Sequence, residues 1–546
     1  MSTLSHPSRT RTNWVPSRFG LVNPICLFWF FVSPVVIFGQ NQLTGPAPAV
    51  LYVDSHAIGT QIGTSWDNAY TDLQDALATA ALLVPNRPVE IRVASGVYRP
   101  DRGTGDRAMS FELISGVALL GQYAGVRAAN PDIRNLRHPP STLEGDLDAS
   151  GDDDENSYHV VTADRVDATA ILDGFLIING HANSTDRRDD RNGGGLFIYE
   201  ASPTFRNCIF INNRAELSGG AAYAYFSSPT FEDCQFRSNH AAEAGGGIFM
   251  SGIGEITLQR CWVVDNFVEP GLEAQCDVPP FYGAPGGDGG GLYLLRADAT
   301  VLNSAFVHNR AGPGGRGAIC PEFPLRSGDG GNGGAIYTTS PPPYLIIRNC
   351  TIVNNQAGQD GQPACDSHGN CGPAGTFGRV GGIFSSSGEF VVHNSILWNN
   401  IDRDGMTESA QLLPSYGVEL NYSCIHGLTG SLGGLGNIGV DPMVSLLPER
   451  LVAVVPGSPV INTGDPVLLP LVGIKAIEGQ PRILCGRIDM GASEFKDCDD
   501  FVHLWPTCLG GPGNPPAGDS CAPIDSNNDS SIALDDFAAF QNSFNK

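Results

Sequence analysis

The sequence predicts an all-β protein built as a right-handed parallel β-helix, a solenoid in which successive turns of the chain stack on one another. Between Gly193 and Asn400 one pattern recurs six times: a glycine cluster, an apolar run, a small residue and an asparagine. Self-similarity at a short period indicates a solenoid. Apolar residues at a two-residue spacing, with many β-branched and aromatic side chains, favour strands over helices. We therefore expect each copy to form one turn, called a rung below, of two or three short strands.

Equivalent positions of the six copies are expected to align as columns when the rungs stack. The glycine clusters begin at Gly193, Gly219, Gly245, Gly289, Gly333 and Gly381. The small position is Cys208, Cys234, Cys261, Ser304, Cys350 and Ser395. The residue two later is apolar, at Phe210, Phe236, Val263, Phe306, Ile352 and Leu397. The residue five later is Asn213, Asn239, Asn266, Asn309, Asn355 and Asn400. The four column cysteines are expected to be buried small hydrophobes.

A tight bend is predicted immediately before the small position. The residue three before that position is again apolar, at Phe205, Phe231, Leu258, Val301, Ile347 and Val392. Because strand side chains alternate, this residue can face inward only if the chain bends. In five copies the residue at the bend is Asn or Asp, which tolerate the left-handed conformation, and Arg260 is the exception.

The repeats resemble those of polymorphic outer-membrane proteins, which are bacterial secreted β-helices. The matching motifs are GGAI at Gly333–Ile336 and F-x-x-N at Phe210–Asn213, Phe236–Asn239 and Phe306–Asn309. The resemblance covers about 210 of the 546 residues. It implies export and a pectin-lyase-like solenoid, but it implies no particular reaction, since the family is defined by its repeats.

Residues 1–39 are interpreted as a secretory signal peptide, which predicts a secreted or cell-surface protein. Three arginines precede the apolar run from Ile25 to Phe38, which ends at Gly39. An uncleaved anchor is the alternative, because Pro34 interrupts the run. No transmembrane span is expected once this segment is removed.

The charge balance argues against nucleic-acid binding. The chain carries a formal charge of −25 with 57 acidic and 32 basic residues, and its only lysines are Lys475, Lys496 and Lys546. A basic patch for nucleic acid or anionic lipid is therefore not expected, whereas divalent cations are favoured.

An amphipathic helix is predicted over residues 64–80, where it would cover the open face of the first rung. Apolar residues from Trp66 to Ala80 recur at helical spacing, with Thr64 or Ser65 available as the N-cap. A partner-binding helix is the alternative interpretation. Residues 40–130 are assigned to this cap and the first rungs, and residues 131–440 to the main β-helix.

Three consecutive rungs carry large inserts at one corner, over residues 267–287, 311–332 and 357–380. Because rungs stack closely, these loops are expected to lie side by side, and function concentrates on loops held by a rigid scaffold. They are the candidate face for a glycan or cell-surface ligand. The alternative is that the inserts arose by sequence drift in a loop that tolerates change and have no function of their own. The insert cysteines are Cys276, Cys320, Cys365 and Cys371, which we expect in disulfides of open connectivity. Glycine runs at 286–291 and 328–334 are interpreted as hinges into the next strand; a resemblance to calcium-binding glycine-aspartate repeats is the alternative.

Residues 441–497 are predicted to close the β-helix as its last irregular rungs. The motifs PGSP, INTGD and DMGASEF resemble the segment that ends many bacterial secreted β-helices. Asn462 stands where that pattern usually has Asp, so no role is assigned to an acid there.

The tail, residues 498–546, contains a glycine- and proline-rich linker and then a calcium-loop pattern. The candidate calcium ligands at loop positions 1, 3, 5, 7 and 12 are Asp525, Asn527, Asp529, Ser531 through its carbonyl, and Asp536. The pattern resembles half of a type I dockerin, which implies a calcium cofactor and a protein partner for docking. Ser530 replaces the usual glycine at position 6, and a plain polar turn before a helix is the alternative.

Two classes of function fit the sequence. The first is a non-catalytic secreted or surface protein that presents loops for adhesion or glycan binding and is docked by its tail. The second is a polysaccharide lyase or hydrolase, since such enzymes use this fold. No catalytic residue is nominated, because no nucleophile motif and no histidine pair with metal spacing is present.

Overall fold

A computed structural model describes residues 47–495 except 137–139, 278–280, 321–323, 340–343, 389, 416, 446–451, 466–474 and 484–486. The interpreted signal peptide and the calcium-loop tail, with its candidate ligands Asp525, Asn527, Asp529, Ser531 and Asp536, lie outside the described residues.

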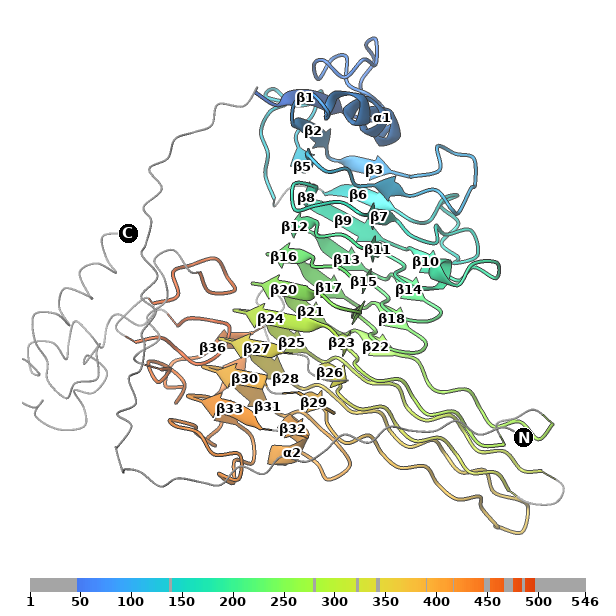
Figure 1. The fold of residues 1–546 in the computed structure, drawn as a ribbon, viewed down its shortest axis with the longest axis vertical. Coiled ribbons are helices and arrows are strands. Elements are labelled where there is room, and N and C mark those ends of the chain that lie inside the picture. The colour runs from blue at the N-terminus through green and yellow to red at the C-terminus, as the bar shows by residue number, and fades with distance from the viewer. Residues whose placement is uncertain are drawn as a thin grey trace, which may run out of the picture. The chain divides into compact units, whose positions relative to one another are not determined.

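The described chain winds into three long parallel sheets and a short fourth one (Figure 1). Sheet A contains β1 (Ala49–Val53), β2 (Val89–Ala94), β5 (Val117–Tyr123), β8 (Ile171–Asp173), β12 (Thr204–Arg206), β16 (Thr230–Glu232), β20 (Glu255–Gln259), β24 (Asp298–Leu302), β27 (Leu345–Arg348), β30 (Phe390–His393) and β33 (Val418–Asn421). Sheet B contains β3 (Gly96–Tyr98), β6 (Ser141–Glu144), β9 (Phe175–Ile178), β13 (Ile209–Ile211), β17 (Gln235–Arg237), β21 (Trp262–Val264), β25 (Ala305–Val307), β28 (Thr351–Val353), β31 (Ile396–Trp398) and β34 (Cys424–Ile425).

The third long sheet and the short sheet are built in the same way, with one strand from each successive rung. Sheet C contains β4 (Phe111–Glu112), β7 (Val161–Asp164), β11 (Leu196–Tyr199), β15 (Ala222–Tyr225), β19 (Ile248–Ser251), β23 (Leu292–Leu295), β26 (Ile336–Thr339), β29 (Ile383–Ser385) and β32 (Leu412–Pro414). Sheet D contains β10 (His181–Ala182), β14 (Arg214–Ala215), β18 (His240–Ala241) and β22 (Phe267–Val268). Each strand pairs in parallel with its counterpart in the next rung, as Phe205 does with Phe231 and Phe210 with Phe236. The right-handed parallel β-helix is therefore confirmed.

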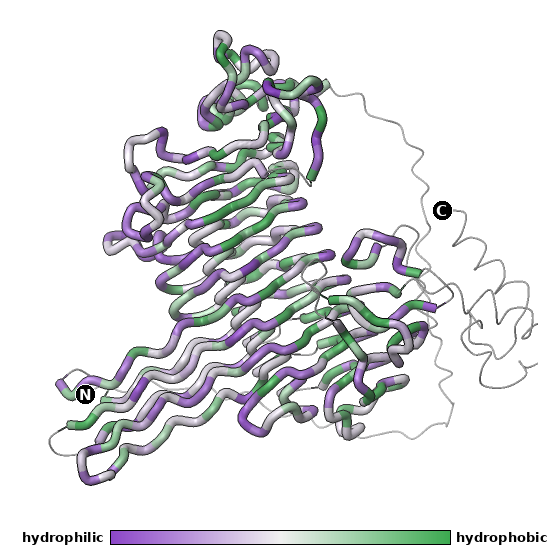
Figure 2. The backbone as a smooth tube through the Cα atoms, turned by 180° about the vertical axis from the view of Figure 1, so that it is seen from behind, coloured by the Kyte–Doolittle hydropathy of each residue, from purple (hydrophilic) through white to green (hydrophobic). Residues whose placement is uncertain are grey.

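The columns read from the sequence form the core. All residues of the small, asparagine and two apolar columns are 0% exposed, and apolar segments lie above one another along the coil (Figure 2). The residues before the small position have φ between +48° and +55°, including Arg260 at +55°. Arg260 accepts this conformation while its guanidinium binds Asp233, with Nε 2.7 Å from Oδ1.

A second bend, which the sequence analysis did not identify, turns the asparagine column inward. The residues just before that column are Asn212, Ser238, Asp265, His308, Asn354 and Asn399, and all have φ between +52° and +57°. Each buried amide then bonds to its neighbours: Asn239 Oδ1 accepts from Asn213 N–H at 3.0 Å, and Asn239 Nδ2 donates to Phe210 O at 3.0 Å. Gln411 ends the ladder by accepting from Asn400 N–H and Nδ2. The buried amides are thus satisfied from rung to rung.

The N-terminal capping helix is present, but it begins later than expected. Helix α1 spans Leu73–Leu83, and its N-cap is Asp72, whose carboxylate accepts from Gln74 N–H at 2.8 Å. Neither Thr64 nor Ser65 caps it, so that expectation was wrong. Trp66 instead precedes the helix and packs between Tyr52 and Tyr123, with ring centroids 4.9 and 5.6 Å away. The buried side of α1 joins the core over β1 and β2.

The described part of residues 441–495 does not continue the coil as a further rung. It contains the antiparallel pair β35 (Val444–Ser445) and β36 (Ala453–Val454), and it packs on the outer side of sheet B. Ala492 N–H donates to Thr351 Oγ1 at 2.9 Å, and Val460 and Met490 lie in one cluster with outward-facing residues of β25, β28 and β31. Short helices occur elsewhere, η1 at Asp189–Arg191 and α2 at Glu408–Gln411.

Candidate functional site

The three inserts leave the coil side by side as arms, and they carry the candidate site. Arm 1 is residues 267–287, arm 2 is 311–332 and arm 3 is 357–380. Each arm has an extended segment that leaves the coil and one that comes back (Figures 1 and 2). These are called the outgoing and returning strands below, although, apart from β22 at the base of arm 1, their described residues belong to none of sheets A to D. Outgoing strands bond to outgoing strands, as Gly271 N–H does to Pro313 O at 2.8 Å. The two layers also bond to each other: Gly331 N–H donates to Gly312 O at 2.9 Å, and Gly358 N–H donates to Gly331 O at 2.8 Å.

Side-chain direction along the arms repeats every third residue, as in a polyproline II chain. On arm 3, Gln359 and Gln362 are exposed, whereas Gly358, Gly361 and Ala364 are buried. In the glycine runs interpreted as hinges, Gly286 and Gly328 are packing residues, since an added Cβ would lie 1.8 Å from Gly312 O and 2.0 Å from Ala284 O. Gly289 and Gly333 have φ of +70° and +67° and bend the chain ahead of β23 and β26.

The outgoing strands of neighbouring arms meet through glycine, whereas the matching positions that face no other arm carry larger residues. A Cβ added to Gly315 would lie 2.0 Å from Leu272 O, and one added to Gly361 would lie 2.0 Å from Gly315 O. Arm 1 has no earlier arm beside it, and there the equivalent position is Leu272, which is 81% exposed. At the opposite edge Pro363 takes the place of Gly317, whose N–H bonds to the next arm, and Pro has no N–H to offer. The bundle is thus closed after three arms.

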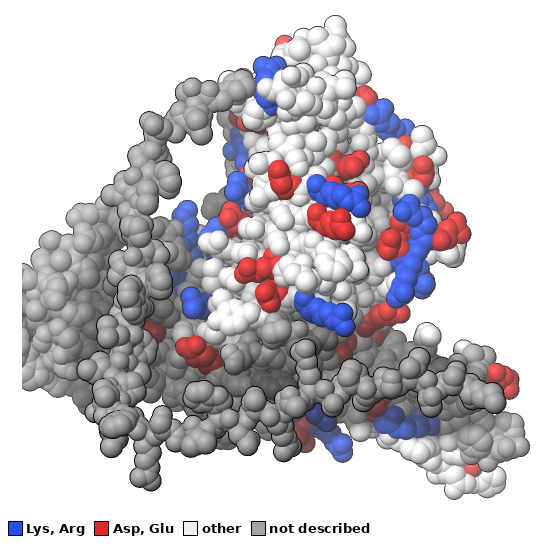
Figure 3. Space-filling view, viewed as in Figure 1, with Lys and Arg blue, Asp and Glu red and all other residues white. Residues whose placement is uncertain are grey.

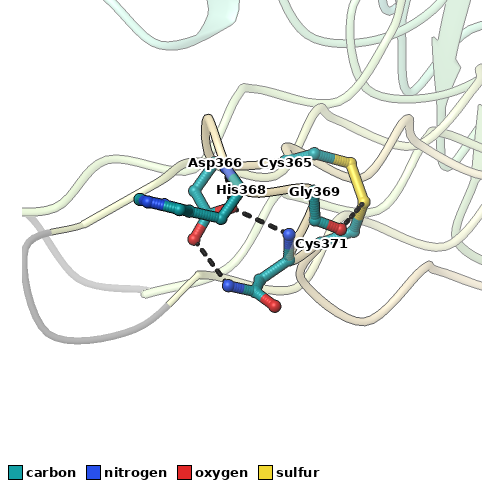
Figure 4. Close-up of a disulfide and its surroundings, with 6 residues drawn as sticks. Cys365, Asp366, His368, Gly369 and Cys371 are labelled. Carbon is teal, nitrogen blue, oxygen red and sulfur yellow. Dashed lines mark hydrogen bonds between the residues drawn. A yellow bond between two sulfur atoms is a disulfide. The ribbon is translucent and has the colours of Figure 1, made fainter.

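Two disulfides fix the arm tips, as expected for the insert cysteines. Cys276–Cys320 joins arms 1 and 2, and Cys365–Cys371 closes the tip of arm 3. In that tip the Asp366 carboxylate accepts from His368 N–H at 2.9 Å and from Asn370 N–H at 2.8 Å (Figure 4). The column cysteines Cys208, Cys234, Cys261 and Cys350 are buried and free, which confirms their interpretation.

The outer side of the outgoing strands is named the outgoing face. Its three rows, counted from the coil to the tips, are Phe267, Arg310 and Gln356; Pro270, Pro313 and Gln359; Glu273, Arg316 and Gln362. A groove of about 300 Å³ lies at its base, lined by the first two rows with Val268, Ala311 and Ala357. The Arg310 guanidinium carbon lies 5.6 Å from the Phe267 ring centroid. Apart from this contact, the polar side chains of the outgoing face make no hydrogen bond or ion pair with any described residue.

The outer side of the returning strands, the returning face, differs in that several of its polar groups bind each other. The Asp329 carboxylate pairs with Arg326 at 2.5 Å and accepts from Thr376 N–H and Oγ1 at 2.6 and 2.7 Å. The hydrogen bond from Arg326 holds the pKa of Asp329 below its usual value. Asp288 accepts from Asn332 N–H at 2.5 Å and from Asn332 Nδ2 at 3.0 Å. Burial raises the pKa of Asp288.

An ion pair braces arm 1 against the coil beside the groove. Glu269 Oε1 lies 3.0 Å from Arg214 Nη2 and 3.7 Å from His240 Nδ1. Burial lowers the pKa of His240, which favours its neutral form at this contact. Acidic and basic side chains are interspersed over the neighbouring surface of the coil (Figure 3), without a patch of one sign.

A ladder of aromatic rings on the outer side of sheet C was missed by the sequence analysis. Its members are Phe197, Tyr223, Phe249, Tyr293, Tyr337 and Phe384. Neighbouring centroids are 4.9–5.6 Å apart and the planes differ by 2–24°. The rings therefore cover each other's faces and leave mainly edges outward, which suits a stabilising stack more than a sugar platform. The signal was present, because an aromatic residue lies four positions after the first glycine in five of the clusters and three positions after Gly381 in the sixth.

Two further observations concern metals and membranes. In the described part of the chain, no three His, Cys, Asp or Glu side chains converge to hold a metal ion. Among these same residues, no helix has the length and hydrophobicity needed to cross a bilayer.

Comparison with known proteins agrees with the fold. Residues 156–314 match a family model described as a right handed beta helix region. The comparison with curated proteins found no match. Solved structures similar to this chain include the pectin methylesterase PemA from Erwinia chrysanthemi, at 14% identity over 59% of this chain and 84% of that one, with a TM-score of 0.26. Another is a pectin methylesterase in complex with hexasaccharide VII, at 13% identity over 60% of this chain and 85% of that one, with a TM-score of 0.26. Likenesses this distant carry no argument about activity.

Proposed function

We propose that this protein is an exported, non-catalytic β-helix protein that binds a glycan through the outgoing face of its arms. The observation that carries the proposal is the set of polar side chains on that face which have no partner in the described structure, above a groove of about 300 Å³. On the returning face, by contrast, Arg326, Asp329 and Thr376 bind one another.

The chemistry of the face suits sugars better than a protein partner. The side-chain amides of Gln356, Gln359 and Gln362 both donate and accept hydrogen bonds, as sugar hydroxyls require. Protein interfaces usually centre on several buried aromatic anchors, whereas Phe267 is the one aromatic side chain in the three rows.

The same face supports binding without hydrolysis. Glycoside hydrolysis generally uses two carboxylates flanking the bond to be cleaved. Glu273 is the single carboxylate in the three rows of the outgoing face. A purified protein that cleaves neutral or acidic polysaccharides would contradict this part of the proposal and favour the lyase or hydrolase alternative.

Export and anchoring complete the proposal. The disulfides at the arm tips accord with an oxidising compartment outside the cytoplasm. Residues 1–39 would direct export, and the dockerin-like tail would dock the protein to a partner through calcium held by Asp525, Asn527, Asp529, Ser531 and Asp536.

A glycan array tests the binding proposal. The wild-type protein is expected to bind a limited set of glycans, and the variant Gln359→Ala with Gln362→Ala is expected to lose most of that signal. Arg379→Ala changes an exposed side chain of the returning face and serves as the control, with binding unchanged. Equal loss in both variants, or no binding by the wild type, would contradict the proposal.

Calcium titration of the full chain tests the tail. Calorimetry is expected to show a site of roughly 10⁻⁵ to 10⁻³ M affinity, at the weaker end because Ser530 replaces glycine. Asp525→Ala removes the first ligand and should abolish this heat while leaving glycan binding intact. A calcium signal that survives the substitution would place the ion elsewhere.

A further inference from the structure

We infer that the ligand of the outgoing face is a linear polymer that runs along the arms, from the coil towards the tips, and presents the same group about every 9 Å. The inference rests on the proposed function and adds the direction and the repeat of the ligand. The distance follows from three residues at about 3.1 Å each in a polyproline II chain.

The direction follows from how the face changes along and across the arms. Along arm 3 the successive side chains are Gln356, Gln359 and Gln362, so every step offers the same amide. Across the arms, the first row changes from Phe267 through Arg310 to Gln356. A polymer of identical units finds identical partners only along arm 3. A polymer lying from arm to arm, along one of the rows, would meet a different side chain every 4.8 Å or so.

The three glutamines along arm 3, called the glutamine row below, differ in burial, so this row has an inner and an outer end. Gln356 is half-buried at the base of the groove, whereas Gln359 and Gln362 are exposed. The first repeat of the ligand therefore lies in the groove beside Phe267 and Arg310. Later repeats extend over the open part of arm 3, and Arg316 lies beside the third step on arm 2.

The close packing of the arms through glycine keeps the glutamine row of arm 3 straight. The amides are fixed relative to each other because their strand is bonded to arm 2 along its length, for example through Gly314 N–H to Gln359 O at 2.8 Å and Gly317 N–H to Gln362 O at 3.0 Å. A pre-organised row loses little conformational freedom on binding a long ligand, so each added repeat can add affinity.

The same geometry argues against a further polyproline II peptide as the ligand. Strands within the bundle approach each other through glycine, as at Gly358 and Gly361. On the outgoing face the corresponding contact would meet Gln, Arg, Pro and Phe side chains, which hold a peptide backbone away.

The experiment is calorimetry on the full chain with two series of oligosaccharides, cello-oligosaccharides and oligogalacturonides, each from disaccharide to octasaccharide. Affinity for at least one series is expected to rise with length and then to level off once the row is filled. Gln356→Ala should weaken all lengths, whereas Gln362→Ala should weaken the long members about 2- to 10-fold and leave the disaccharide unchanged, as expected for one hydrogen-bonding group.

Each other outcome decides the matter. Affinity that does not depend on length, or equal effects of Gln356→Ala and Gln362→Ala at every length, would overturn the inference while leaving glycan binding in place. Absence of binding to both series together with a negative glycan array would overturn the proposed function as well. Binding of a (Pro-Pro-Gly)-repeat peptide that competes at the outgoing face would replace the sugar by a peptide ligand.

Discussion

The outgoing and returning faces of the arms are built by the same three inserts but use their polar residues in opposite ways. On the returning face Asp329 binds Arg326 and Thr376, so these groups stabilise the bundle and have little capacity left. On the outgoing face the side chains of Gln359, Gln362 and Arg316 bind no described residue. The contrast shows that a polar surface becomes a candidate site through what its groups leave unbonded, and composition alone does not reveal it.

The largest expected effect comes from a substitution that separates two arms and so disrupts both faces. Gly315→Ala places a methyl group 2.0 Å from Leu272 O, so arms 1 and 2 cannot stay in contact, at a cost of about 1–3 kcal/mol or more. Limited proteolysis should then cut within the arms, and glycan binding should be lost. Leu272→Ala is the matched control, because it puts alanine at the same position of arm 1, where no earlier arm is present. Equal protease resistance of the two variants would contradict the packing described here.

The next largest effect separates stability from binding on the returning face. Asp329→Ala removes one ion pair and two hydrogen bonds from Thr376, and we expect the arms to lose about 1–3 kcal/mol of local stability. Hydrogen exchange of the arm amides measures this loss, while affinity for the glycan should stay within twofold. Asp329→Asn retains an acceptor and should lose less. A large fall in affinity with unchanged exchange would reverse the roles of the two faces.

A smaller effect separates binding from stability on the outgoing face. Arg316→Ala should lower affinity about 2- to 10-fold through loss of one hydrogen-bonding group, without changing the melting temperature. Arg379→Ala, at an exposed position of the returning face, should change neither quantity. If the two arginine variants behave alike, the distinction between the faces fails.

The smallest effect is a difference in pH response. The pKa of Asp329 is lowered in the folded protein, so its contribution to arm stability is present above the ordinary carboxyl pKa near 4 and is lost as pH falls through the lowered value. The Asp329 side chain is 41% exposed, which keeps this contribution below about 1 kcal/mol. Affinity at the outgoing face should be flat from about pH 7 to 9, since amides and guanidinium groups do not titrate there and His240, which packs on Phe267 and has a lowered pKa, stays neutral. A binding curve with a midpoint in that range would show that a titrating group takes part.

The rungs could be predicted from the sequence because their signals are local. An inward small residue, an apolar residue two later and a bend before them lie within a few positions of each other. Arg260 lacks the bend-forming chemistry of Asn, yet it adopts the same φ because its rung must stay in register with its neighbours. The start of α1 was misplaced because Trp66 is buried and Tyr70 is partly buried for other reasons, so helical spacing alone did not mark the first turn.

The arms could be located from the sequence but their internal structure could not. Their corner and their disulfide cysteines follow from repeat alignment. The bonds that order them join residues such as Gly271 and Pro313, or Gly314 and Gln359, which are more than 40 positions apart. The sequence also does not show which polar side chains of the arms bind each other, so the unbonded amides of the outgoing face could be identified only from the structure.

The closed edges of the bundle have a consequence for how such a protein can change in evolution. Glu269 and Leu272 end the stack on one side, and Pro363 ends it on the other, while arm 2 carries glycine at the matching positions and accepts a neighbour on both sides. The rung that contains arm 2 is therefore an insertable cassette. A tandem duplication of residues 310–355 would add one arm between the two closing arms, preserve the asparagine register and widen the outgoing face by the width of one arm, about 4.8 Å.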